Sequence, residues 1–89
     1  MRTTELNKLD NKVNTKSSIV EGLTNEINGS FTQAIVDAEA ELQNATGDAV
    51  QAAYTKVITA KSALAVAQEQ LKYETDLLNN YTLERDRFK

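Results

Sequence analysis

Three carboxylates stand close together in the first half of the sequence. Asp37 and Glu41 are four positions apart and would share one face of a helix, with Glu39 between them in the chain. Carboxylate oxygens are the ligands that hard cations such as Ca²⁺ prefer. The segment has neither the spacing of an EF-hand loop nor a turn that would gather further oxygens. A solvated acidic face is therefore favoured, and we predict no metal site.

Histidine and cysteine do not occur in the 89 residues. The chain thus lacks the commonest general base, the thiol nucleophile and the Glu-x-x-His pair of di-iron helical bundles. We expect a protein that is not an enzyme, with no catalytic residue and no cofactor. The absence of cysteine does not distinguish one cellular compartment from another, so localisation stays unknown.

Lys8, Lys12 and Lys16 follow one another at spacings of four and would lie along one helix face. The net charge of the chain is −3, and no basic groove with interleaved aromatic residues occurs. The pattern favours a solvated stripe beside acidic neighbours over a site for phosphate groups, and it argues against nucleic acid as the main ligand. The N-terminal residues contain no continuous apolar run, so we expect neither a signal peptide nor a membrane span.

A long amphipathic helix is predicted for residues 49–88. Its apolar positions recur at alternating spacings of three and four, which is the a/d heptad pattern of a coiled-coil seam. Only Glu74 and Arg85 interrupt the apolar character of that seam. The predicted seam positions are Val50, Ala53, Val57, Ala60, Leu64, Ala67, Leu71, Glu74, Leu78, Tyr81, Arg85 and Phe88.

The first arm, residues 4–44, has a similar seam, and Thr3 or Thr4 is the predicted N-cap. Two consecutive spacings of four, from Ile27 through Phe31, shift the heptad register. Near Gly29 two alternatives stay open: a continuous or kinked helix, which we favour, or a break that gives three helices. The predicted seam positions are Leu6, Leu9, Val13, Lys16, Val20, Leu23, Ile27, Phe31, Ile35, Ala38 and Leu42.

Residues 45–48 are predicted to reverse the chain. Gly47 suits the left-handed residue that follows a helix, and Asp48 with Gln51 forms a capping box for the next helix. Two arms of equal length joined by a short turn predict an all-α fold, a single long antiparallel helical hairpin over residues 1–89. In such a hairpin residue i lies opposite residue 93 − i, so Lys16 and Glu74 are about one layer apart. These two charges either pair and fix the register or reach water separately.

The second arm also carries apolar residues outside the seam, which two helices cannot cover. We predict that these residues form an interaction surface. They are Tyr54, Ile58, Val66, Tyr73 and Leu77.

Acidic residues concentrate near the turn. Residues 21–69 have a net charge of −5, while the remaining residues sum to +2. Such a polar chain can associate with copies of itself or with a basic surface. We therefore expect a structural subunit that packs into a larger assembly, such as a virion or a secretion apparatus. The alternative is a small adaptor or chaperone-like module that binds a partner helix.

Overall fold

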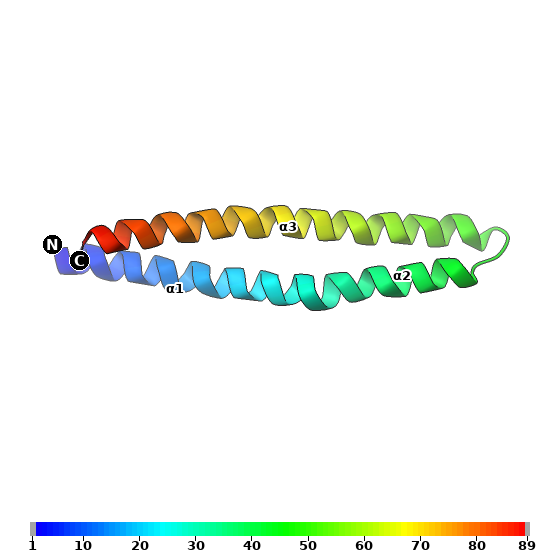
Figure 1. Ribbon diagram of the computed structural model, residues 1–89, viewed down its shortest axis with the longest axis horizontal. Coiled ribbons are helices and arrows are strands. Elements are labelled where there is room, and N and C mark those ends of the chain that lie inside the picture. Colours follow the sequence, from blue (N-terminus) through cyan, green and yellow to red (C-terminus); the bar gives the residue numbers. More distant parts are fainter. Residues whose placement is uncertain (1, 89) are drawn as a thin grey trace. The chain divides into compact units, whose positions relative to one another are not determined.

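The computed structural model describes residues 2–88, and its elements are all helical (Figure 1). They are α1 (Arg2–Glu26), the π-helical turn η1 (Ile27–Phe31), α2 (Thr32–Asn44) and α3 (Ala49–Arg87). No strand occurs among these residues. The predicted all-α helical hairpin is confirmed, with its reversal at residues 45–48.

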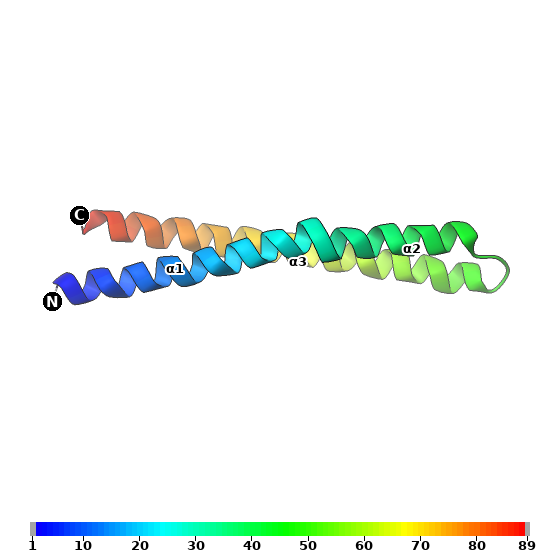
Figure 2. The same cartoon turned by 90° about the horizontal axis from the view of Figure 1, so that it is seen from below.

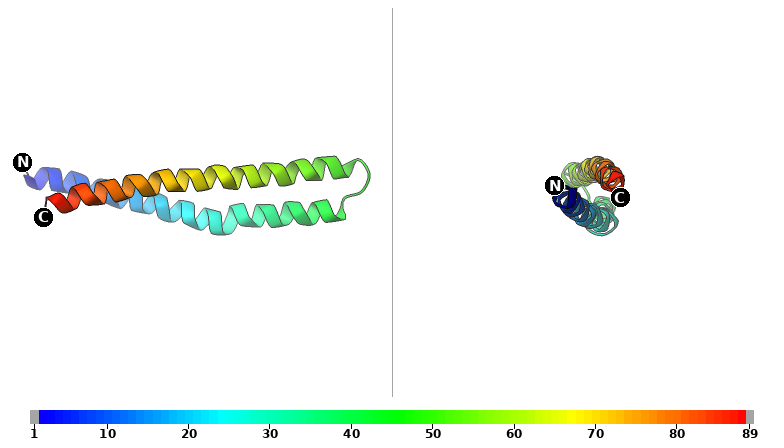
Figure 3. Two further views of the ribbon diagram at one scale, coloured as in Figure 1. Left: turned by 45° about the horizontal axis from the view of Figure 1, so that its top comes forward. Right: turned by 90° about the vertical axis from the view of Figure 1, so that its left-hand side faces the viewer.

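The chain packs as two compact units, each built from two antiparallel helical segments. Unit 1 comprises Met1–Thr24 and Gln70–Lys89, and unit 2 comprises Asn25–Glu69. In unit 1, α1 as far as Thr24 runs beside the second half of α3 (Figures 1 and 2). In unit 2, η1 and α2 run beside the first half of α3, and the connecting turn closes that unit (Figure 3).

The predicted seams are the buried side of both arms. All eleven seam positions of the first arm are buried or half-buried, and so are eleven of the twelve in the second arm. Val50, next to the turn, is the exception and remains 42% exposed. The most deeply buried apolar residues are Leu9, Val13, Ala38, Ala53, Val57 and Ala67. The heptad pattern therefore predicted the core of both units.

The irregular spacing around Gly29 corresponds to the π-helical turn η1. Glu26 and Thr32, which flank it, both have right-handed helical backbone angles, so the helix does not break there. A π-turn holds one extra residue, which offsets the phase drift that two consecutive spacings of four would cause. The Thr32 hydroxyl donates a 2.6 Å hydrogen bond to the Ile27 carbonyl, five residues earlier, and thereby satisfies an acceptor inside the widened turn.

The turn depends on Gly47, whose φ of +59° is the left-handed conformation predicted for it. Main-chain bonds of 3.2 Å, from the amides of Ala49 and Val50 to the carbonyls of Thr46 and Gly47, close the start of α3. Among the described residues no side-chain bond from Asp48 to α3 accompanies them, so the predicted capping box does not form.

The predicted cap of the first helix is also wrong. α1 begins at Arg2, so Thr3 and Thr4 lie inside its first turn rather than ahead of it.

Two glycine substitutions test whether backbone conformation is what distinguishes the turn from the π-helical segment. A Cβ added at Gly47 or at Gly29 meets no atom within 4 Å, so neither change causes a clash. Gly47→Ala should cost about 1 kcal/mol of unfolding free energy, because the left-handed conformation is strained for alanine. Gly29→Ala should instead stabilise by about 0.5–1 kcal/mol. Urea titration at equal protein concentrations measures both values, and the opposite ordering would contradict this account of the turn.

Candidate functional site

The sequence-predicted interaction residues lie on α3, divided between the two units. In unit 2, Tyr54, Ile58 and Val66 are 54%, 50% and 66% exposed. In unit 1, Tyr73 is 62% exposed, whereas Leu77 is half-buried. Large apolar side chains at such exposures are available to a partner, because the seam already occupies the facing sides of the helices. Leu77 is the member of the predicted set that the hairpin itself partly covers.

Four further exposed apolar residues were not among the predicted interaction residues. Val36 on α2 follows the seam residue Ile35 directly, and a heptad projection of the first arm would have found it. The other three are Ile19, Val50 and Leu83. Val36 and Val50 belong to the same unit as Tyr54 and Ile58, and Val36 is the one of the two on α2.

Lys16 and Glu74 meet inside the seam of unit 1. Lys16 Nζ lies 2.6 Å from Glu74 Oε2, and the two side chains are 21% and 10% exposed. The pair therefore forms, which is one of the two alternatives that the sequence left open. The hydrogen bond to Glu74 raises the pKa of Lys16 above its ordinary value of 10.5, against a smaller opposing effect of burial. Glu74 is the buried charged residue of the described chain.

Tyr81 stacks beside the same pair. Lys12 Nζ lies 5.3 Å from the centre of the Tyr81 ring, within cation–π distance. Lys12, Lys16 and Tyr81, together with Asn11 and Thr15, line an open hollow of about 230 Å³. Sites for small molecules typically enclose about 300–1,000 Å³, so this hollow is too small and too open to enclose a ligand of that kind. Lys8 Nζ, the third lysine of the predicted stripe, lies 3.6 Å from Glu5 Oε1. All three lysines of the stripe thus have partners within the chain.

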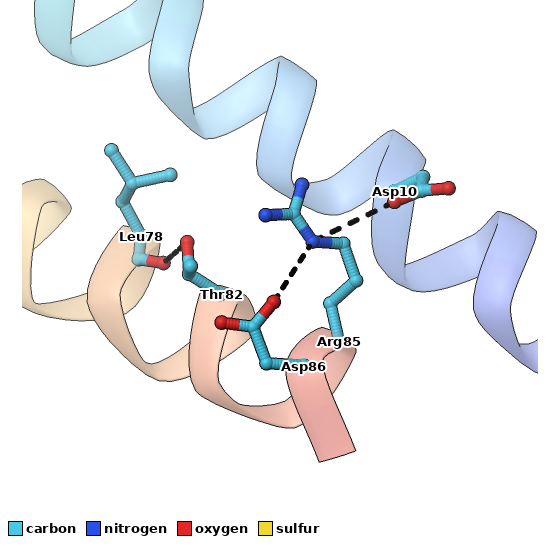
Figure 4. A network of polar contacts seen from close by, with 5 residues as sticks. All are labelled: Asp10, Leu78, Thr82, Arg85 and Asp86. Atoms are coloured by element: carbon cyan, nitrogen blue, oxygen red, sulfur yellow. Dashed lines mark hydrogen bonds and ion pairs between the residues drawn. The ribbon is translucent and has the colours of Figure 1, made fainter. Parts of the chain in front are cut away.

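Arg85 is the second charge in the seam of α3, and Figure 4 shows its surroundings. Its Nε lies 3.7 Å from carboxylate oxygens of both Asp10 and Asp86. These separations allow ionic attraction but exceed hydrogen-bond length, and Nε is buried without a hydrogen-bond acceptor. Thr82, one turn earlier, donates a 2.8 Å bond to the Leu78 carbonyl. The contact to Asp10 ties α1 to the end of α3.

Two of the three acidic residues of α2, Asp37 and Glu41, have partners within the chain. Asp37 accepts a 2.8 Å hydrogen bond from Gln33, and Glu41 forms a 2.8 Å ion pair with Lys56 of α3. Within residues 2–88 no cluster of three or more His, Cys, Asp or Glu side chains is placed to hold a metal ion. None of the described helices is long and apolar enough to cross a membrane.

Comparison of the chain with protein-family models, with curated proteins and with solved structures finds no match.

Removing one charge of the Lys16–Glu74 ion pair should lower stability by an amount that depends on which of the two residues is replaced. Lys16→Met leaves a buried carboxylate that is too short to reach water, whereas Glu74→Leu leaves an ammonium whose stem can extend to solvent. The melting temperature should therefore fall more for Lys16→Met than for Glu74→Leu. The double variant should return to the wild-type value or above it, because well-packed apolar pairs replace buried ion pairs without loss.

Lys56→Met is the matched control, because the Lys56–Glu41 pair is more than half exposed. It should change the unfolding free energy by less than about 1 kcal/mol. If the Lys16→Met/Glu74→Leu double variant were no more stable than Lys16→Met alone, the stability effects of the two residues would not be coupled.

The same pair predicts a dependence on alkaline pH. Because the pKa of Lys16 is higher in the folded protein than in the unfolded chain, its contribution to stability is complete below pH 10.5. That contribution is lost as the pH rises through the folded-state pKa. Smaller electrostatic contributions from Tyr81 and Tyr73 also raise the pKa of Lys16. The stability difference between wild type and Lys16→Met should thus narrow above pH 10.5 in thermal melts, and a constant difference would contradict it.

Proposed function

We propose that this chain is a non-enzymatic structural subunit that packs into a larger assembly, such as a virion or a secretion apparatus, through apolar residues of α3. The observation that carries the proposal is the exposure of Tyr54, Ile58, Val66 and Tyr73, each at least half exposed on a helix whose seam is already filled. Burying these side chains in a partner would stabilise the assembly by about 25 cal/mol for each Å² of apolar surface removed from water.

The composition of the two units supports an assembly role. Unit 1 buries charge in its seam at Lys16, Glu74 and Arg85, whereas the seam of unit 2 is apolar throughout. A pair of helices with so thin a core gains little stability from its own interior, so contacts with further subunits would add a large share.

The net negative charge of unit 2 favours association of copies in specific orientations over unspecific association. Unit 2 contains six acidic and two basic residues, so unaligned copies repel each other. Association then requires positions at which an acidic and a basic side chain are brought together.

Self-association is the property that tests the proposal. Sedimentation velocity and circular dichroism across a hundredfold dilution series should show oligomers that dissociate, with a loss of helicity as they do so, because mass action couples folding to association. A monomer whose helicity and melting temperature are independent of concentration would contradict self-assembly. That result would favour the alternative function, an adaptor or chaperone-like module that offers the same face to a partner helix.

A further inference from the structure

Within unit 2, the two open sides of the helix pair differ in chemistry. Residues that directly precede an a position, at heptad position g, include Glu41 and Lys56, which form the 2.8 Å ion pair. That pair lies on one side of the seam. On the other side lie the residues that follow seam positions, at heptad positions e and b. Their apolar members are Tyr54, Ile58 and Val36, all at least half exposed.

Two charged residues flank this apolar group along the helices. Glu39 on α2 follows the seam residue Ala38, and Lys61 on α3 follows the seam residue Ala60, so both occupy position e. In the register predicted from the sequence, with residue i opposite 93 − i, Val36 is level with residue 57 and Glu39 is level with Tyr54. Lys61 is then seven residues further along, about 10 Å by the helical rise. Neither Glu39 nor Lys61 forms an ion pair or hydrogen bond within the described residues.

We infer that this face, defined by Val36, Tyr54, Ile58, Glu39 and Lys61, binds the same face of a second copy of the chain. The inference rests on the proposed function and names its partner and contact. A two-fold axis at right angles to the helices, midway between the levels of Val36 and Ile58, lays the second copy antiparallel on the first. Because Glu39 and Lys61 are equally distant from this axis on opposite sides, the axis brings Glu39 of each copy level with Lys61 of the other.

Charge complementarity selects this antiparallel arrangement. The apolar residues meet at the centre, and two Glu39–Lys61 pairs form at the edges, as an isologous contact requires. In a parallel arrangement Glu39 would instead face Tyr54 of the second copy, and the net negative charge of both units would remain uncompensated. The result is a four-helix contact of the kind that antiparallel bundles use.

Charge reversal tests the pairing without altering the fold, because Glu39 and Lys61 are exposed. Glu39→Lys and Lys61→Glu each convert two attractive contacts into two repulsive ones, so each variant alone should dimerise about tenfold more weakly than wild type. Mixing the two variants should restore wild-type affinity as a heterodimer, because the two lysines on this face of one copy then meet the two glutamates on the same face of the other. Native mass spectrometry counts the heterodimers, and circular dichroism confirms the helicity of each variant.

A second pair of variants tests the apolar centre. Ile58→Ser should weaken dimerisation about tenfold or more, while Ala63→Ser, on the same helix but at position g on the opposite side of the seam, should leave it unchanged. Wild-type protein that stays monomeric would overturn the proposed function together with this inference. Wild-type dimers that tolerate both charge reversals, or single variants that fail to form heterodimers on mixing, would overturn the inference alone.

Discussion

Burial of the heptad seam is the constraint on which both units of this protein depend. A pair of helices has a single interface, so each side chain either lies in the seam or faces outwards. The deepest residues, among them Leu9, Val13 and Val57, are small to medium in size, and three of the six most buried apolar residues are alanines. Such a seam brings the helices close but removes little apolar surface from water. Stability is therefore sensitive to each seam position and to any subunit that covers the outside.

The two units use that seam differently. Unit 1 includes Lys16, Glu74 and Arg85, whose charges must find partners across the interface because a buried unpaired charge is costly. Such pairs contribute less net stability than apolar contacts, but they disfavour a shifted register in which each charge would lie opposite an apolar residue. Unit 2 has no charge in its seam, and its irregular feature is the π-helical turn, which realigns the first arm with α3.

The exposed surface follows from the same geometry. Because the seam takes the a and d positions, apolar residues at b, c and e cannot be covered by a second helix. Tyr54, Ile58 and Val36 are left outside on one side of unit 2, and the Glu41–Lys56 ion pair lies on the other. This asymmetry favours a specific contact with a second copy over unspecific hydrophobic association.

The sequence by itself determined the seam and the turn, because a heptad period and a glycine with positive φ each follow from local geometry that few alternatives satisfy. Long charged side chains have no such restriction, since each reaches several neighbours. The tertiary structure therefore decided that Lys16 pairs with Glu74 rather than reaching water, and that Arg85 lies between Asp10 and Asp86. It also decided that the extra residue near Gly29 is accommodated in a π-turn. A π-turn and a helix break fit the same local sequence pattern, and they differ only in how the arm packs on α3. Leu77, predicted from its position to be outside, is half-buried for the same reason: coverage depends on the neighbouring helix as well as on the residue's own phase.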